Sequence, residues 1–510
     1  MKNLMFPFLF FAFNALNAQS GFEKLYTQSG SLKSIELDNG NLLVGIGGGP
    51  GATGLSLTDT QGNILQANSY VQWPLLGPGS FRRDNVNGVY FVTGYVDGFC
   101  QGHTQIFPVI GKMDLVGSII YLKRYVLNEG CQSLAIDLET TNDNGVVTWG
   151  WRTNFFALRV DSNLNHVWSK HFDRHGGFQF IKELPSGDLL AGINMDTAGV
   201  VVARMDPAGN FLWCKSYIRP GGIVQDCVVE NDSTFIITGF TDSLSNGNQK
   251  LFMMNLNGTG DVQWCRGYNS VFQWRADYPQ RIVKTLDNNY AMIAISGGHP
   301  VLMKTNTNGD TLWTRAAGIP NYGYETADLL AYSDGGFLYS GIILGNLPNM
   351  NTGLPYIFKT DSLGHLPCSE TQPPQITVSE LFPVDSSFTL TSVDGATAYT
   401  ASVSDTVYDP VVVYDGCTFT TSIAPIISHA RPPKVHPNPN TGHFTVEFTD
   451  PLTVDSFYSV YDAVGKLLLQ RPLVKGQESE EVDLSRFGKG TYLLRITDRD
   501  GVCNERVVVQ

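Results

Sequence analysis

Between residues 19 and 368 the chain repeats one pattern of apolar and polar positions. An apolar run ends at Asp or Asn, Gly follows three positions later, and a large residue stands seven positions after the Asp or Asn. Asp and Asn tolerate turn conformations and Gly readily adopts positive φ, so each copy predicts a β-hairpin. Six of the seven copies have this Gly, and the third has Leu164 instead. The anchors, spaced 45 to 55 residues apart, are Asp59, Asp114, Asp161, Asp206, Asn257, Asn306 and Asp361.

A second series of turns, each followed by an apolar strand, lies between these anchors. It also has seven members, among them SGDLLAGINM from Ser186 and DGGFLYSGII from Asp334. Each repeat therefore holds two hairpins, or four strands, which is the content of one β-propeller blade. No repeat shows the helical period of about 3.6 residues over a long stretch, which excludes helical solenoids. The pattern predicts an all-β protein with a seven-bladed β-propeller over residues 19–368.

The strand after each anchor carries a third pattern. A large residue is often followed by a basic residue two positions later and an aromatic residue four positions later, as in WCKSY at 213–217. The seventh anchor is followed by CSETQ, which lacks the pattern, whereas FEKLY at 22–26 has it. Residues 22–26 are therefore expected to be the outer strand of the last blade and to close the ring, which removes an unpaired sheet edge. The alternative is a stray strand of an incomplete eighth repeat.

These repeats resemble those of secreted bacterial β-propellers, including the delta-60 type, to which VVARMDPAGNFLW from Val201 is close. They also approach the quinoprotein-like repeat, in which the interval from Asp to Trp is one residue longer. The sialidase Asp-box is less similar, because its interval is two residues shorter. Seven near-copies cannot all lie at one site, so we interpret the repeated Asp and Trp as turn and packing residues.

The chain begins with the features of a secretory signal peptide. Lys2 precedes an apolar segment at 4–13, and the small residue Ala18 precedes the expected cleavage site at Gln19. This segment is too short to span a membrane, and no other stretch has eighteen consecutive apolar residues. We therefore expect a signal peptide over residues 1–18 and no transmembrane helix. A buried N-terminal helix is the alternative.

The C-terminal region, residues 434–510, carries several spaced signatures, from KVHPNPNTGHFTVEF to GKGTYLLRITD. It resembles the type A C-terminal sorting domain of the Bacteroidota type IX secretion system. The resemblance implies a β-sandwich that the type IX secretion machinery recognises and removes during export. It also implies that the protein is secreted, extracellular or attached to the outer-membrane surface. The matching positions are Pro437, Asn438, Pro439, Gly442, Asp462, Gly465, Gly490 and Tyr492.

Residues 369–433 separate the repeats from this tail. They begin with the polar SETQPPQ, continue with alternating runs such as SSFTLTSV, and end in SIAPIISHARPPK. The pattern predicts a small β-module or stalk followed by a flexible linker. Cys368 and Cys417 bracket the module and are candidates for a disulfide, although spacing alone does not fix connectivity and either thiol could be free or paired elsewhere.

The charge and residue composition of the chain limit the classes of molecule that it is expected to bind. The net charge of −13 argues against nucleic-acid binding, which requires concentrated Lys and Arg. Gly accounts for 53 of 510 residues, which agrees with many tight turns. Eight cysteines in an oxidising compartment permit disulfides, and Cys100 and Cys131 are a second candidate pair.

The loops between blades vary far more than the Asp turns, and they are expected to gather on one face. A rigid scaffold with variable loops commonly carries binding sites, and aromatic and Arg side chains suit a glycan or protein ligand. The alternative for each aromatic residue is that it covers the end of its own blade. The candidate ligand-binding residues are Trp73, His103, Arg174, His175, Arg219, Trp274, Arg275, Tyr278, Tyr322 and Tyr324.

The sequence contains no local catalytic motif: HExxH, GxSxG, a Walker loop and CxxC are all missing. It therefore predicts no catalytic residue, metal site or cofactor. We expect a surface-displayed binding or adhesion protein with an extracellular glycan or protein ligand. The alternative is an extracellular propeller hydrolase or lyase acting on polysaccharide, since propeller active sites are assembled from distant loops.

Overall fold

The computed structural model divides the chain into two compact units, Met1–Cys417 and Thr418–Gln510, which are described separately. The expected signal peptide lies outside the described residues. Among the described residues no helix is both long and apolar enough to cross a membrane. The structure describes residues 21–26, 33–45, 53–71, 81–83, 90–100, 103–127, 133–152, 155–172, 176–195, 199–218, 222–241, 249–272, 274, 281–318, 323–344, 354–401, 404–407, 413–415, 433–448, 456–462, 467–497 and 502–510.

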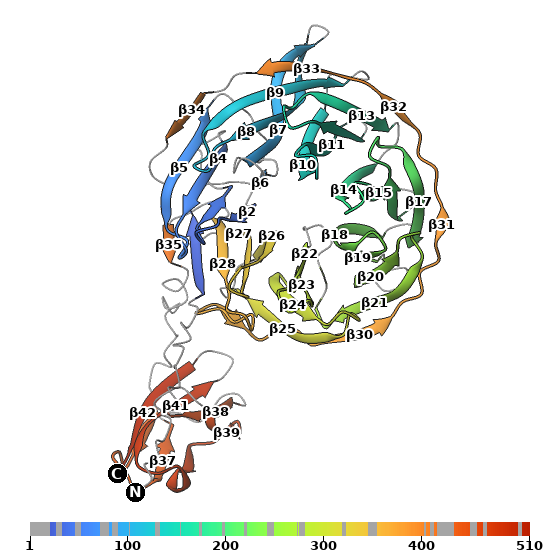
Figure 1. Ribbon diagram of the computed structural model, residues 1–510. Coiled ribbons are helices and arrows are strands. Elements are labelled where there is room, and N and C mark those ends of the chain that lie inside the picture. Colours follow the sequence, from blue (N-terminus) through green and yellow to red (C-terminus); the bar gives the residue numbers. More distant parts are fainter. Residues whose placement is uncertain are drawn as a thin grey trace, which may run out of the picture. The chain divides into compact units, whose positions relative to one another are not determined.

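Seven antiparallel five-stranded sheets stand around a common centre in the first unit (Figure 1). We number them 1 to 7 in chain order. The four inner strands of each sheet follow one another in the chain, except that β1 takes the fourth place in sheet 7. The consecutive strands of each sheet pair as antiparallel hairpins, as the repeated turns predict, and β1 pairs antiparallel with β28.

Sheet 1 contains β2 (Ser34–Glu36), β3 (Leu42–Val44), β4 (Thr53–Thr58) and β5 (Ile64–Val71). Sheet 2 contains β6 (Phe81–Arg83), β7 (Tyr90–Cys100), β8 (His103–Met113) and β9 (Ile119–Leu127). Sheet 3 contains β10 (Ser133–Thr140), β11 (Val146–Arg152), β12 (Phe155–Val160) and β13 (His166–Phe172). Sheets 4 and 5 contain β14 (Gly176–Glu183), β15 (Leu189–Met195), β16 (Gly199–Met205) and β17 (Phe211–Ile218); and β18 (Ile223–Asn231), β19 (Thr234–Phe240), β20 (Leu251–Asn257) and β21 (Val262–Ser270). Sheets 6 and 7 contain β22 (Arg281–Lys284), β23 (Tyr290–Ser296), β24 (His299–Thr305) and β25 (Thr311–Ala317); and β26 (Gly323–Ala331), β27 (Phe337–Leu344), β28 (Leu354–Lys359) and β1 (Phe22–Tyr26).

The predicted Asp turns are confirmed in their local geometry. In sheet 4, Asp206 Oδ1 accepts hydrogen bonds from the N–H groups of Ala208 and Asn210 at 3.0 and 2.8 Å. Gly209 has a φ of +81°, and its N–H donates to the Asp206 carbonyl. The third copy keeps the same turn with Leu164 at a φ of +58°. The repeated Asp therefore acts on its own turn.

The Trp and Tyr of the third pattern connect neighbouring sheets. On β17, Trp213 Nε1 donates to the Gly258 carbonyl at 3.0 Å, and Tyr217 Oη donates to the Gly260 carbonyl at 2.7 Å. Both acceptors lie in the Asn-Gly turn of sheet 5, so the outer strand of one sheet holds the turn of the next. The equivalent tyrosines that donate to a turn of the following sheet are Tyr26, Tyr125 and Tyr268.

Sheet 7 unites the two ends of the repeat region. The N-terminal strand β1 pairs antiparallel with β28, so that Phe22 lies opposite Lys359 and Leu25 opposite Tyr356. Tyr26 is fully buried, and its hydroxyl donates to the Gly62 carbonyl in sheet 1 at 2.8 Å. The residues at 22–26 therefore contact both the last sheet and the first.

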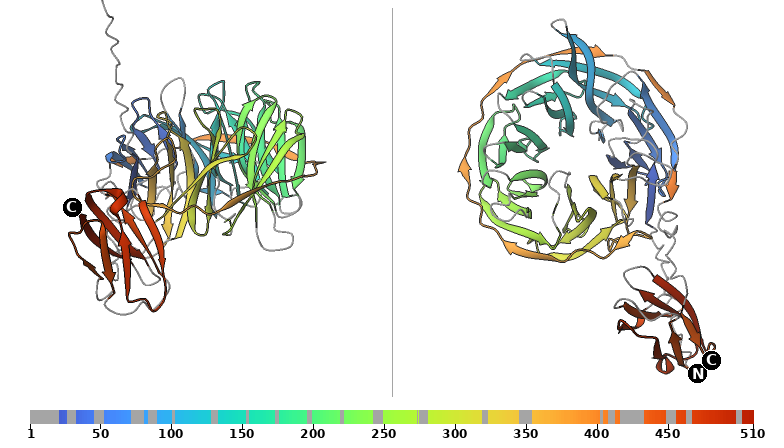
Figure 2. Two further views of the ribbon diagram at one scale, coloured as in Figure 1. Left: turned by 90° about the horizontal axis from the view of Figure 1, so that it is seen from below. Right: turned by 180° about the vertical axis from the view of Figure 1, so that it is seen from behind.

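The separate β-module expected after residue 368 is not found. Instead, residues 369–415, here called the belt, add a fifth, outermost strand to every sheet, from sheet 6 backwards to sheet 1 and then to sheet 7. Figures 1 and 2 show the belt in orange around the outside of the seven sheets. An alternating run can pair with any open sheet edge, so the local pattern did not identify its partner. The belt strands are β29 (Glu370–Thr371), β30 (Ile376–Glu380), β31 (Ser386–Ser387), β32 (Ser392–Asp394), β33 (Ala396–Ala401), β34 (Ser404–Val407) and β35 (Val413–Asp415).

Apolar side chains of the belt enter the grooves between neighbouring sheets. Leu390 is 8% exposed and belongs to the apolar cluster between sheets 3 and 4, against which Phe388 also packs. Leu381 packs against the cluster between sheets 4 and 5. The N–H groups of Leu381 and Phe388 donate to the carbonyls of Cys265 and Cys214, each at 2.9 Å. The belt is thus anchored by both packing and backbone hydrogen bonds.

The start of the belt is fixed to β1. Buried Glu23 accepts hydrogen bonds at Oε1 from the N–H groups of Cys368 and Ser369, at 2.7 and 2.8 Å. Cys368 is disulfide-bonded, and its predicted partner Cys417 lies outside the described residues. The other predicted pair also cannot be followed, because the Cys100 side chain and all of Cys131 lie outside the described part. Three described cysteines are free and buried, namely Cys214, Cys227 and Cys265.

The second unit is built from two antiparallel sheets that share one apolar core. A 3₁₀-helix, η1 (Ser485–Phe487), precedes β41. The sheets, in their strand order, are β36 (Lys434–His436), β37 (His443–Glu447) and β40 (Ser479–Asp483); and β39 (Leu467–Leu473), β38 (Ser456–Tyr461), β41 (Gly490–Thr497) and β42 (Val502–Val509).

The signature residues of this unit bind its termini together. Asn438 exchanges hydrogen bonds with β42, donating to the Arg506 carbonyl and accepting from the Val508 N–H. Gly442 has a φ of +103°, and a Cβ there would lie 2.7 Å from Ser485. The Tyr492 hydroxyl lies 2.8 Å from the carbonyls of Phe487 and Gly488.

Of the remaining signature positions, Gly465 lies outside the described residues. Pro437 and Pro439 follow cis peptide bonds next to Asn438. Gly490 begins β41 opposite Val509, and Asp462 follows β38.

Candidate functional site

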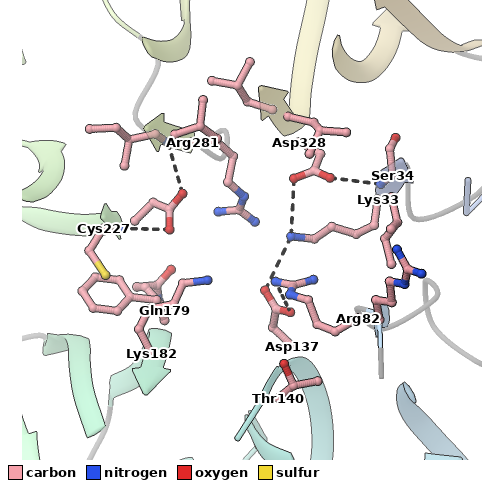
Figure 3. Close-up of a pocket in the computed structure, with 18 of the residues that line it drawn as sticks. Lys33, Ser34, Arg82, Asp137, Thr140, Gln179, Lys182, Cys227, Arg281 and Asp328 are labelled. Atoms are coloured by element: carbon pink, nitrogen blue, oxygen red, sulfur yellow. Dashed lines mark hydrogen bonds and ion pairs between the residues drawn. The ribbon is translucent and has the colours of Figure 1, made fainter. Parts of the chain in front are cut away.

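The innermost strands of all seven sheets converge on one cavity of about 380 Å³ (Figure 3). Its wall combines charged and polar groups with apolar ones in the centre of an apolar scaffold. The charged and polar lining residues are Lys33, Ser34, Arg82, Arg83, Asp137, Thr140, Gln179, Lys182, Asp226, Arg281 and Asp328. Apolar lining residues include Trp149, Phe180 and Cys227.

Three aspartates reach the cavity from equivalent β-bulges. The strand register shifts just before Asp137 on β10, before Asp226 on β18 and before Asp328 on β26. A bulge changes the direction of the following side chain, and these bulges place the three carboxylates on the cavity wall. The carboxylates of Asp137 and Asp226 each accept the N–H of the following residue, at 2.8 and 2.9 Å.

The same register position carries other residues in other sheets. Asp137 faces Trp149 across its hairpin, and the corresponding positions hold Phe180 in sheet 4 and Arg281 in sheet 6. Each of the three aspartates, and Arg281, stands six positions before an Asp of the following turn; these turn residues are Asp143, Asp232, Asp287 and Asp334. The sequence therefore does mark these residues, by their fixed distance from the turn that follows the innermost strand. The patterns that predicted the fold lie elsewhere, in the turns and the outer strands.

Two of the aspartates join neighbouring sheets through the backbone. Asp226 Oδ2 accepts the Ile282 N–H at 3.1 Å, and Asp328 Oδ2 accepts the Ser34 N–H at 3.0 Å. In each pair the acceptor lies on the innermost strand of one sheet and the donor on that of the next. These carboxylates thus have a structural task at the cavity wall.

Cations approach the same carboxylates from several sheets. Lys33 Nζ lies 3.5 Å from Asp137 and 3.9 Å from Asp328, and Arg82 Nη2 lies 3.4 Å from Asp137. Figure 3 shows the Arg281 guanidinium pointing into the cavity from the side opposite Arg82. The site is therefore a network of donors and acceptors from distant parts of the chain.

Burial and the neighbouring carboxylates shift the pKa values of the cavity lysines in opposite directions. Burial, followed by the nearby charge of Arg281, lowers the pKa of Lys33, although Asp137 and Asp328 act to raise it. Burial is the largest influence on Lys182 and disfavours its charged form, but Glu139, 3.1 Å away, together with Asp226 and Cys227, raises the pKa of that lysine. Burial raises the pKa of the Cys227 thiol well above its ordinary value, so this thiol is not a reactive nucleophile.

Two buried polar groups of the lining are without hydrogen-bond partners among the described residues: Trp149 Nε1 and Ser34 Oγ. The Trp149 side chain is 1% exposed. Since the indole nitrogen can only donate, it requires an acceptor that the described protein does not supply. Among the described residues no group of three or more His, Cys, Asp or Glu is arranged to hold a metal ion.

Of the predicted aromatic and Arg face, the structure describes the side chains of two residues, Trp274 and Tyr324. Trp274 and Tyr324 are each 1% exposed, and Trp274 Nε1 donates to the Tyr268 carbonyl at 3.0 Å. Both are packing residues, as the alternative interpretation of loop aromatics expected. His103 begins β8, but its side chain lies outside the described part. The other seven candidates also lie outside it: Trp73, Arg174, His175, Arg219, Arg275, Tyr278 and Tyr322.

Comparison with known proteins identifies the C-terminal unit. Residues 434–510 match the family described as the secretion system C-terminal sorting domain. This match confirms the predicted export route: the chain carries a type IX secretion sorting domain and is secreted or attached to the cell surface. No curated protein matches the chain.

Solved structures resemble the chain in fold alone. A polysaccharide lyase named Uly1 is 9% identical, with a TM-score of 0.42, over 65% of this chain and 90% of the lyase. The NanB sialidase of Streptococcus pneumoniae is 12% identical, with a TM-score of 0.36, over 67% of this chain and 68% of the sialidase. A protein of unknown function from Bacteroides caccae is 12% identical, with a TM-score of 0.35, over 55% of this chain and 93% of that protein. The fold is all-β and β-propeller-like, and similarity this distant carries no argument about activity.

Proposed function

We propose that the chain is an exported, surface-displayed, seven-bladed β-propeller that binds an extracellular glycan or protein ligand in its central cavity. The supporting observation is the cavity itself, to which all seven innermost strands contribute and in which charged groups concentrate. Ligand sites are usually pre-formed cavities in which a few polar groups converge from an apolar scaffold, and this cavity has such groups. The loop residues outside the described part remain proposed contributors to the same ligand surface.

Closure of the propeller by β1 belongs to this proposal. Its support is the pairing of β1 with β28 and the hydrogen bond from Tyr26 to Gly62 in sheet 1. Deletion of residues 22–26 should lower the melting temperature and cause concentration-dependent association, because it exposes a sheet edge. A monomer with unchanged melting would mean that the ring closes in another way.

Binding is favoured over the alternative of a polysaccharide hydrolase that works by paired carboxylates. Hydrolysis by paired carboxylates needs at least one carboxyl group available to exchange protons with the substrate. Both oxygens of Asp226 and one oxygen each of Asp137 and Asp328 instead accept backbone N–H groups. Adhesion to an extracellular polymer would follow from binding at a surface-displayed protein.

The direct test is ligand capture by the full-length chain on glycan and surface-protein arrays. Gln179 lies on the β14 bulge, half-buried at the cavity wall, so Gln179→Trp should obstruct the cavity and reduce capture at least tenfold. Gln61 lies exposed in a turn, so Gln61→Trp is the matched control and should leave capture unchanged. Capture that is equal in both variants would place the ligand elsewhere, and release of new sugar ends from a bound glycan would favour the enzyme.

A further inference from the structure

The cavity wall offers more hydrogen-bond donors than acceptors. Lys33, Arg82 and Arg281 reach it, and lysine and arginine side chains carry only donors. The three carboxylates of the wall are already engaged. Asp137 pairs with Lys33 and Arg82 and accepts the Leu138 N–H, Asp226 accepts two backbone N–H groups, and Asp328 accepts one. A ligand that complements this wall must therefore bring acceptors of its own.

Unsatisfied groups indicate the same chemistry independently. Trp149 Nε1 is buried and has no acceptor within the described part of the chain. Trp149 lies opposite Asp137 in the β10–β11 register, and both line the cavity. Ser34 Oγ, also in the lining, is likewise buried and unsatisfied among the described residues. A buried donor without an acceptor is costly, so an oxygen-rich ligand group would gain by reaching it.

The electrostatic environment of Lys33 favours the same kind of ligand. Burial, and after it the charge of Arg281, lowers the pKa of Lys33, with a smaller lowering by Arg82. Asp137 and Asp328 oppose this effect without cancelling it. A negative group placed among these cations would relieve the repulsion between them.

We infer that the ligand of the central cavity carries an anionic, oxygen-rich group, a carboxylate or sulfate on a sugar, held by Lys33, Arg82 and Arg281 and hydrogen-bonded by Trp149. This inference rests on the proposed function, ligand binding in the cavity, and adds the chemical class of the ligand. Arginine suits this task because its planar fork matches both carboxylate and sulfate oxygens. The cavity volume of about 380 Å³ is in the range of small-ligand sites, so it suits the end of a glycan better than a folded protein.

The test is titration calorimetry of the full-length chain with four probes: trigalacturonate, a sulfated galacto-oligosaccharide, the uncharged oligosaccharide of equal length, and inorganic sulfate. At least one charged oligosaccharide should bind tenfold or more tightly than the uncharged one, and its affinity should fall with added salt. Which charged probe binds identifies carboxylate or sulfate as the recognised group.

Three variants locate the binding. Arg281→Gln should weaken binding at least tenfold, and Trp149→Phe, which removes the indole N–H, should weaken it several-fold. Lys284→Gln is the matched control, because Lys284 lies on the same strand but pairs with Glu230 away from the cavity lining. Circular dichroism melting of each variant separates loss of binding from loss of fold.

The outcomes separate the two proposals. Equal binding of charged and uncharged oligosaccharides, unaffected by Arg281→Gln, would overturn the anionic class while leaving ligand binding intact. Binding of inorganic sulfate alone would also overturn it, as an adventitious ion only. Failure of all four probes, together with empty glycan and protein arrays, would remove both proposals.

Discussion

Leu390→Ala in the belt should destabilise the ring measurably. Leu390 is 8% exposed and packs in the apolar cluster between sheets 3 and 4. Truncation of a buried leucine to alanine costs about 2–5 kcal/mol, depending on how well the site collapses. Because Leu390 keeps 8% exposure, we expect the lower end of this range, about 2 kcal/mol. This corresponds to a roughly thirty-fold increase in the equilibrium constant for opening.

Two measurements on the full-length chain test this value. Urea denaturation gives the loss of stability, and hydrogen exchange of β13 and β32 shows whether the opening is local to their pairing. Phe382→Ala is the matched control on the same belt, because Phe382 is 84% exposed and should change stability by less than about 0.5 kcal/mol. If both variants were equally stable, or if Phe382→Ala were the less stable, the belt would not be anchored by groove packing.

Asp226→Ala should cost about 1–3 kcal/mol in urea denaturation, because it leaves the N–H groups of Cys227 and Ile282 without their acceptor; unchanged stability would show that water replaces it freely. Burial acts to raise the pKa of Asp206, but hydrogen bonds from Asn210 and Ala208 outweigh it and lower the pKa. Its stabilising effect is therefore full above the ordinary pKa of about 4 and is lost as the pH falls through the lowered value. Asp206→Asn should keep the turn, as Asn does in the fifth and sixth copies, and weaken the acid dependence of unfolding; an identical acid profile would contradict this. Mass spectrometry of the surface form should find no peptide after about Lys434, and recovery of Gln510 would refute removal of the sorting domain.

The hairpins and the pattern of the outer strands could be predicted from the sequence because they depend on residues close together in the chain. Asp206 and Gly209 complete a turn within four residues, so the spacing alone fixes the geometry. The Trp213 and Tyr217 pattern was visible as a repeat, and the structure adds that these side chains bond to the turn of the next sheet. The sorting domain was recognised for a similar reason, since its signature residues hold fixed positions along 434–510.

The central site was not found from sequence, although its residues recur at one register position. Lys33, Asp137, Asp226, Arg281 and Asp328 are separated by tens to hundreds of residues, and each alone resembles an ordinary strand residue. Only the ring brings their strands to one axis. The two described aromatic candidates, Trp274 and Tyr324, are buried, because a bulky apolar ring gains more from packing than from exposure to water.

By itself the sequence determined the number of repeats, the turn at each anchor, the all-β class and the route of export. Each of these follows from local backbone preferences or from a contiguous motif. The tertiary structure decided which strands and side chains that are distant in the sequence contact one another. In it the belt strands pair with the outer edges of the seven sheets, Trp274 and Tyr324 are buried, and the charged groups line the central cavity. The physical reason is that a strand edge and a buried charge are satisfied by partners remote in the chain, and the local pattern does not say which partner that is.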